Sequence, residues 1–411
     1  MADRYFHKTL KNGLTLLMER MPEMTSAAMT FLVPAGVSND REGETGTATI
    51  LADLVLRGAG DRDNRQLTEY LDGLGLQRSC AAGIYHTRFG CAAVADKVVE
   101  SLKTYADIVR RPKLPESGFG PARELALQSL AGIEDEPRQK LSIALREKFF
   151  PSPLGRNTLG TKEDLEGLTL DKVSREWNRR YRPNGAILAI AGNIEFDAVN
   201  AEVEKHFGDW KSEAIEPVKL IPSTVHAYHE QQESEQTHIG IAYPSILETD
   251  SNYYLVRLFS EVLGGGMSGR LFTEVREKRG LCYNVWAGYQ AAKEFGCIMG
   301  YSGTSNDRAQ DTLDCIIAEM HRLSEGITVA ELARAKTGLK ANLIMQGEST
   351  SGRAGAIAGD FFIRGRIRSL DEIKNAIDSV SLGQVNAYLK ITRPGPFTIV
   401  TVGPKELKLP S

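Results

Sequence analysis

The chain repeats itself over a long period, and this repeat limits the available folds more than any other sequence feature. Residues 182–192 (RPNGAILAIAG) recur in character as residues 393–403 (RPGPFTIVTVG), 211 positions later. Two more pairs lie in the same order: residues 28–34 with 239–244 at an offset of 210, and Phe89-Gly90-Cys91 with Phe295-Gly296-Cys297 at an offset of 206. Similar offsets in one order indicate two copies of a unit of about 200 residues.

Within one copy, apolar residues follow strand and helix periods in an irregular order. Strands are predicted at residues 14–19, in a run ending near Pro34, on both sides of Gly83 within 76–95, and at 186–191. Helices are predicted at 46–57, 66–74, 96–109, 122–133 and 170–181. Because strands and helices do not alternate regularly, the sequence favours an α+β fold of two homologous domains. Each would be a mainly antiparallel sheet with helices packed on one face.

The join between the copies is polar and contains Pro217 and Pro222, which suits an exposed and fairly stiff linker. A chain of 411 residues is also too long for one ordinary core. We therefore expect a first domain at residues 1–212, a linker at 213–225 and a second domain at 226–411.

Composition excludes several classes of function. The net charge is −3, which does not favour binding to nucleic acid or to an anionic membrane. Hydrophobic residues make up 42% of the chain, as in a globular protein. No apolar run approaches the roughly 18 residues that cross a bilayer. Residues 1–8 lack the apolar core of a secretory signal and the character of a transit peptide. We therefore expect a cytoplasmic protein with no nucleic-acid or membrane partner.

Cysteine, histidine and glycine patterns offer no metal or phosphate motif. The five cysteines have no metal or redox spacing, which favours buried free thiols. His226 and His229 are the one close histidine pair, and on a strand they would face opposite sides. The glycine run at 263–270 lacks the Lys-Ser/Thr of a phosphate loop and follows a predicted helix. A flexible connection between helices is favoured there, with a substrate-contacting loop as the alternative.

Four segments spread over nearly the whole chain resemble the pitrilysin (insulinase) family of zinc metallopeptidases, especially its short processing-peptidase-like branch. They are residues 11–15 (KNGLT), 34–40 (PAGVSND), 181–184 (YRPN) with Gly192-Asn193-Ile194, and 276–283 (REKRGLCY). The resemblance implies a chamber between two half-structures, in which a substrate peptide pairs as an added strand with an edge strand of the metal-bearing domain. The match to that edge strand, near residues 76–82, is loose.

The active helix of this family carries an inverted zinc motif, His-x-x-Glu-His. Two histidines four residues apart lie on one helix face and can bind one metal ion, while the glutamate acts as general base on the metal-bound water. In this chain Thr49 and Asp53 occupy the histidine positions and Ala52 occupies the base position. The third ligand, a glutamate from a later helix, falls at Gln128 or Ser129. The resemblance therefore implies a degenerate metal site and no zinc on this chain.

The second-domain signature keeps an arginine and a tyrosine, Arg276 and Tyr283. The spacing predicts Arg276 in the last turn of a helix that Gly280 ends, and Tyr283 on the strand that starts just after, so that the two can converge. The resemblance implies that both hydrogen-bond the substrate carbonyl and help to stabilise the oxyanion formed in hydrolysis. The alternative is that Arg276 complements the helix dipole and Tyr283 is a half-buried strand aromatic.

Loss of the metal ligands together with retention of Arg276 and Tyr283 is typical of a divided enzyme. The leading hypothesis is a non-catalytic subunit of a heteromeric zinc metalloendopeptidase that is inactive alone. A homologous partner chain in a heterodimer would bring zinc, and both chains would enclose the peptide substrate. The first alternative is a structural or binding protein of the same fold with no role in proteolysis, like the core subunits of respiratory cytochrome complexes. A self-sufficient hydrolase with an unfamiliar site is the least favoured.

Overall fold

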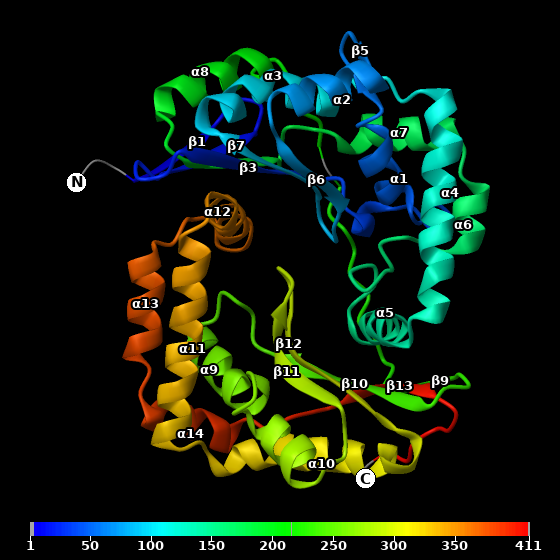
Figure 1. Ribbon diagram of the computed structural model, residues 1–411, viewed down its shortest axis with the longest axis vertical. Helices are drawn as coiled ribbons and strands as arrows, with labels where there is room; N and C mark the ends of the chain where they lie inside the picture. Colours follow the sequence, from blue (N-terminus) through cyan, green and yellow to red (C-terminus); the bar gives the residue numbers. More distant parts are fainter. Residues whose placement is uncertain (1–3, 215, 410–411) are drawn as a thin grey trace. The chain divides into compact units, whose positions relative to one another are not determined.

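The computed structural model describes residues 4–214 and 216–409 (Figure 1). Residues 1–3, residue 215 of the expected linker and residues 410–411 lie outside the described residues, so the expectations placed there stay predictions. The chain packs into two compact units that exchange segments. Unit 1 comprises Met1–Gly132, Arg156–Leu220 and Gln346–Ile367, and unit 2 comprises Ile133–Gly155, Ile221–Met345 and Arg368–Ser411.

Unit 1 is built on a six-stranded sheet. Its strands are, in spatial order, β1 (Tyr5–Thr9), β2 (Thr15–Arg20), β8 (Ile187–Gly192), β3 (Ser26–Val33), β7 (Thr87–Val94) and β6 (Gln77–Ala82). β2 and β8 run parallel, and the other neighbouring pairs are antiparallel. The last of these six strands along the chain, β8, is therefore inserted between β2 and β3, and β6 is an edge strand of the sheet.

Unit 2 repeats this sheet. Its strands are, in spatial order, β9 (Ala227–Gln231), β13 (Thr398–Gly403), β10 (Gln236–Ser245), β12 (Gly296–Ser305) and β11 (Asn284–Ala291). The order and directions match β2-β8-β3-β7-β6 in unit 1. The register matches as well, since the pair Leu16 with Leu188 corresponds to Ala227 with Ile399. The predicted α+β class with two homologous, mainly antiparallel domains is confirmed.

One of the three repeated pairs of segments, residues 89–91 and 295–297, does not occupy equivalent positions in the two sheets. Cys91 on β7 lies opposite Met29, whereas Cys297 on β12 lies opposite Pro244. Pro244 corresponds to Pro34, which follows β3, and not to Met29. The match at an offset of 206 is therefore a coincidence of sequence, and the sheet itself repeats at 210 to 211 residues.

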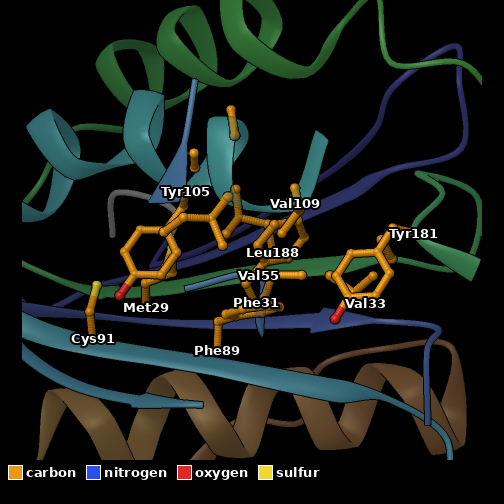
Figure 2. Packing of buried hydrophobic residues seen from close by; sticks show 14 of the residues in the cluster. Met29, Phe31, Val33, Val55, Phe89, Cys91, Tyr105, Val109, Tyr181 and Leu188 are labelled. Atoms are coloured by element: carbon orange, nitrogen blue, oxygen red, sulfur yellow. The ribbon is translucent and has the colours of Figure 1, made fainter. Parts of the chain in front are cut away.

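Most unit 1 helices cover one face of its sheet. They are α1 (Thr47–Leu54), α2 (Asn64–Gly73), α3 (Ala95–Arg110), α4 (Glu116–Gly132), α6 (Lys162–Gly167), α7 (Leu170–Arg180) and α8 (Phe196–Phe207), with the short elements η1 (Val37–Asn39), β4 (Gly58–Ala59) and β5 (Arg62–Asp63). The core between these helices and the sheet contains Phe31, Phe89 and Leu188, together with Tyr105 and Val109 of α3 (Figure 2).

The other face of the unit 1 sheet is covered by α12 (Thr350–Arg364), a helix from the second half of the chain (Figure 1). Alternate residues of a strand point to opposite faces. Leu17 on β2 therefore packs with Ile357 and Ala358 of α12, and its neighbours Leu16 and Met18 enter the main core. The sequence predicted helices on one face of each sheet only. The structure shows that α12 also covers the opposite face of the unit 1 sheet.

Unit 2 receives the reciprocal helix, α5 (Pro137–Phe149), which packs on β10 and β13. Its remaining helices are η2 (Ile133–Asp135), α9 (Tyr253–Gly264), η3 (Phe272–Lys278), η4 (Asn306–Arg308), α10 (Ala309–Arg322), η5 (Leu323–Glu325), α11 (Val329–Gly347), α13 (Leu370–Ser379) and α14 (Leu382–Ile391). No helix within residues 4–214 and 216–409 is long and apolar enough to cross a bilayer.

Candidate functional site

Helix α1, which the family resemblance predicts to be the active helix, is fixed at its N-terminus by a buried carboxylate. Asp40 accepts hydrogen bonds from the backbone N–H of Gly46 (2.9 Å) and of Ala48 (3.2 Å). Arg180 donates to Asp40 at 2.6 Å and to Glu176 at 2.8 Å, and all three side chains are buried. Burial raises the pKa of Asp40 above its ordinary value, against the opposing effect of Arg180. This network holds α1 in place.

The two histidine positions of the motif hold side chains that are engaged in structural contacts. The Thr49 hydroxyl donates a hydrogen bond to the backbone carbonyl of Thr158. Asp53 accepts a hydrogen bond from Nε of Arg57, which lies just beyond the end of α1. Both groups therefore bind other parts of unit 1.

The base position offers no proton acceptor on its side chain. Ala52 is buried, and its backbone carbonyl accepts a hydrogen bond from Sγ of Cys80 on β6 at 3.2 Å. Burial, with a smaller contribution from the charge of Asp53, raises the pKa of the Cys80 thiol to about 12. A thiol with this pKa stays protonated near neutral pH, whereas a nucleophile must be a thiolate.

The helix expected to carry the third ligand is α4, and it packs beside α1 as the resemblance predicts. Gln128 and Ser129 are both exposed on it. The Ser129 hydroxyl donates to the carbonyl of Leu125 in the same helix at 2.8 Å. The structure thus brings the two helices together without the groups that would bind a metal.

These groups do not fit a zinc ion. Zinc takes imidazole, thiolate and carboxylate ligands, usually four in a tetrahedron. The positions offer a hydroxyl that is already a donor, a carboxylate paired with a guanidinium, and an exposed amide or hydroxyl. Across residues 4–214 and 216–409, no three His, Cys, Asp or Glu side chains are grouped so that they could hold a metal ion.

Arg276 and Tyr283 lie on either side of the junction between η3, a π-helix, and β11. Arg276 lies in the last turn of η3, and Gly280, at a φ of +61°, donates its N–H to the Arg276 carbonyl at 3.0 Å. The N–H of Tyr283 donates to the carbonyl of Gly303 on β12 at 3.1 Å. The predicted position of Arg276 is confirmed, and Tyr283 directly precedes the strand instead of lying within it.

Both side chains of the signature are exposed. Tyr283 is 67% exposed, and the Arg276 guanidinium lies 4.8 Å from the ring centroid of Phe272. In the part of the chain that the structure describes, neither side chain makes a hydrogen bond or ion pair. By contrast, Lys278 and Arg279 in the same segment both pair with a carboxylate, Glu274. Convergence of Arg276 and Tyr283 on a substrate stays a prediction.

The glycine run follows α9 and leads into η3, so the predicted connection between helices is confirmed. A Cβ at Gly264 would lie 2.2 Å from the backbone N of Ala287, so only glycine lets α9 approach β11 this closely. Arg270 closes the run with two bonds to Glu331, of 2.7 and 3.0 Å. Met267 at its centre is 77% exposed.

The remaining cysteine and histidine expectations can also be compared with the structure. All five cysteines are free, and Cys91, Cys282 and Cys297 are buried as predicted, whereas Cys80 and Cys315 are only partly buried. His229 contacts the hydroxyl of Thr401 at 2.9 Å, a contact between neighbouring strands. Neither observation adds a candidate ligand.

Sequence reasoning missed several residues that shape the degenerate site. Arg57 could have been found, because residues four apart on a helix are neighbours and Asp53 and Arg57 have this spacing. Thr158 could not have been found, since it lies in a loop more than 100 residues from Thr49 along the chain. The Asp40 and Arg180 pair likewise joins distant segments.

The comparisons with known proteins cover both halves of the chain. The family model described as Insulinase (Peptidase family M16) matches residues 15–162, and that described as Peptidase M16 inactive domain matches residues 167–339. An uncharacterized zinc protease of Rickettsia bellii is 26% identical over an alignment of 416 positions that covers 99% of each chain. One of Bacillus subtilis is 25% identical over an alignment of 410 positions that covers 98% of each chain.

Solved structures agree at the level of the fold. A peptidase M16 inactive domain from Pseudomonas fluorescens has a TM-score of 0.88 at 22% identity, covering 99% of this chain and 100% of that one. A protease from Helicobacter pylori has a TM-score of 0.89 at 20% identity, covering 97% and 99%. A chain of complex III2 from Candida albicans has a TM-score of 0.81 at 20% identity, covering 97% and 95%. The chain belongs to the insulinase family of peptidases (peptidase family M16).

Proposed function

We propose that this chain is the non-catalytic subunit of a heteromeric zinc peptidase. It supplies half of a peptide-binding chamber together with Arg276 and Tyr283, and a homologous partner chain supplies zinc and the general base. One contrast carries the proposal. The groups at the metal positions are engaged in structural bonds, whereas Arg276 and Tyr283 are exposed and have no hydrogen bond or ion pair among the described residues.

The chemistry of the two exposed side chains suits this role. A guanidinium presents five N–H donors in a fixed fork, and a tyrosine presents one hydroxyl donor. Both can donate to a peptide carbonyl oxygen, and their bonds strengthen as that oxygen gains negative charge during attack by water. The contact of Arg276 with the Phe272 ring limits the freedom of the guanidinium before substrate binds.

The test is reconstitution with a homologous chain from the same organism that carries His-x-x-Glu-His. We expect hydrolysis of a peptide substrate in the mixture, reduced by roughly 10- to 1000-fold in kcat by Arg276→Ala and by a smaller factor by Tyr283→Phe. Arg279→Ala and Tyr228→Phe are the matched controls, because Arg279 is an exposed neighbour paired with Glu274 and Tyr228 is an exposed tyrosine elsewhere in unit 2.

The outcomes separate the proposal from its alternatives. If Arg276→Ala and Tyr283→Phe leave turnover equal to that of the controls, the role assigned to the pair is wrong. If no homologous zinc-bearing chain associates with this one, the subunit proposal itself is wrong.

A structural role is the second candidate, and the likeness to a chain of complex III2 from Candida albicans favours it. In that case the chain would assemble stably with proteins that are not peptidases, and replacement of Arg276 would change no proteolytic rate. Identification of the proteins that co-purify from the native source distinguishes the two candidates.

A further inference from the structure

Unit 2 contains a cavity of about 410 Å³ beside α5 that the proposed function does not use. Helix α5 contributes Arg138, Ser142 and Arg146 to its wall, and the sheet contributes Trp286 of β11 and Tyr301 of β12. A volume of this size is typical of sites that bind small molecules or a few side chains of a peptide.

The cavity is cationic. Arg138 and Arg146 are eight residues apart, which places them about 12 Å apart along the helix. Among residues 4–214 and 216–409, neither guanidinium has an ion-pair partner. Glu136 is the one carboxylate among the lining residues, and no ion pair joins it to either arginine. The described lining therefore carries an excess of positive charge.

The two guanidinium groups are instead placed against aromatic rings. Arg138 lies 5.0 Å from the ring centroid of Tyr301, and Arg146 lies 5.6 Å from that of Phe150. Burial lowers the pKa of Arg146, as expected where a cation loses water without gaining an anion. An anionic ligand would offset this desolvation.

Between the arginines, the sheet presents an apolar surface. Trp286 lies opposite Tyr301 on the neighbouring strand, and Gly288 lies opposite Met299. A Cβ at Gly288 would meet no atom within 4 Å, so space is left open beside Met299. Tyr301 is held by His238, whose Nδ1 lies 2.9 Å from the tyrosine hydroxyl. The lining thus has an arginine at each end and an apolar surface between them.

We propose that this cavity binds an extended acidic peptide segment, with one carboxylate near Arg138, another near Arg146, and an apolar side chain against Trp286 and Met299. In an extended chain, residues i, i+2 and i+4 share one face, and i and i+4 lie about 13 Å apart, which matches the spacing of the arginines. The assignment of this peptide as a substrate rests on the proposed function, whereas its binding to the chain alone does not.

The probe is the capped peptide acetyl-Glu-Ala-Phe-Ala-Glu-amide, titrated into the full chain while tryptophan fluorescence is recorded. Trp286 lines the cavity, and Trp177 and Trp210 belong to unit 1, so Trp286→Phe should abolish the signal change. We expect saturable binding that weakens with salt. The matched glutamine peptide should bind at least about 10-fold more weakly, because it lacks the two carboxylate charges that strengthen hydrogen bonds from the arginines.

Arg138→Gln and Arg146→Gln should each weaken binding of the acidic peptide by about 10-fold or more. Arg334→Gln is the control, because Arg334 is exposed on α11 and does not line the cavity. Arg138 is itself exposed, so its replacement is compatible with folding. Equal binding of the acidic and glutamine peptides, or unchanged binding by Arg138→Gln, would overturn the proposal.

A competition experiment shows whether the carboxylate that binds belongs to a peptide or to a small acid. If free 3-phenylpropionate competes as strongly as the peptide, the site takes a small aromatic acid and the peptide assignment is wrong. If the peptide does not bind but the reconstituted peptidase still depends on Arg276, this inference fails while the proposed function stands.

Discussion

Asp53, which the family resemblance predicts at the position of the second zinc-ligating histidine, accepts a hydrogen bond from Arg57, three residues beyond the end of α1. The carboxylate is thereby part of a local ion pair with the segment that follows the helix. Both side chains are partly exposed, at 32% and 25%, so the pair contributes little to stability.

Asp53→Ala should lower the free energy of unfolding by less than about 1 kcal/mol, because an exposed ion pair between residues four apart is worth only a few tenths of a kcal/mol. It should leave the turnover of the reconstituted peptidase unchanged. Urea denaturation and kcat of the mixture measure the two effects. A collapse of turnover without loss of stability would mean that Asp53 takes part in catalysis.

Arg353→Met should destabilise unit 1 strongly. Arg353 on α12 donates to Glu19 on β2 at 2.7 Å, and both side chains are almost fully buried. Removal of Arg353 leaves the buried Glu19 carboxylate with Arg4, which is 45% exposed, and with the Tyr5 hydroxyl, so we expect a loss of about 2–4 kcal/mol. Urea denaturation followed by fluorescence of Trp177 and Trp210, in a Trp286→Phe background, reports on unit 1. Arg334→Met is the control, and equal losses in both variants would contradict the role of the pair.

Replacement of Glu331 should change how stability depends on pH. Burial alone would raise the pKa of Glu331, but hydrogen bonds from Arg270 and from the Thr328 N–H lower it from 4.5 to about 2. The stabilisation is therefore complete above pH 4.5 and is lost as the pH falls toward 2. It amounts to at most about 3 kcal/mol. Urea denaturation should show Glu331→Gln well below the wild type at pH 7 and close to it near pH 2. A difference independent of pH would rule out this linkage.

Gly264→Ala should displace β11, whereas Gly288→Ala should not. A Cβ at Gly264 would lie 2.2 and 2.3 Å from backbone atoms of Ala287, and one at Gly288 would meet nothing within 4 Å. We expect a loss of about 2 kcal/mol or more for Gly264→Ala and a change within about 0.5 kcal/mol for Gly288→Ala. Urea denaturation and the emission maximum of Trp286 measure both. Similar stabilities would show that α9 does not press on the strand.

The sheets could be predicted because their information is local and repeated. Alternating apolar residues identified the strands, and the offset of 211 predicted that β8 and β13 are equivalent. The pairing of Leu16 with Leu188, and of Ala227 with Ile399, came from the structure. The position of Arg276 followed from the turn that Gly280 makes at a positive φ.

The exchanged helices could not be predicted. An apolar stripe such as Ala354, Ile357 and Ala358 shows that one face of a helix is buried, but it does not show which sheet covers that face. The same limit applies to α5. A hydrogen bond to a distant loop, such as that from Thr49 to Thr158, leaves no periodic signal in the sequence.

The central claim is that this chain contributes to proteolysis without binding the catalytic metal. It is tested most directly by measuring zinc content and peptide hydrolysis for the purified chain alone and after addition of a homologous chain that carries His-x-x-Glu-His. The account predicts far less than one zinc per chain, no hydrolysis by the chain alone, and hydrolysis in the mixture. One zinc per chain together with hydrolysis by the chain alone would contradict it.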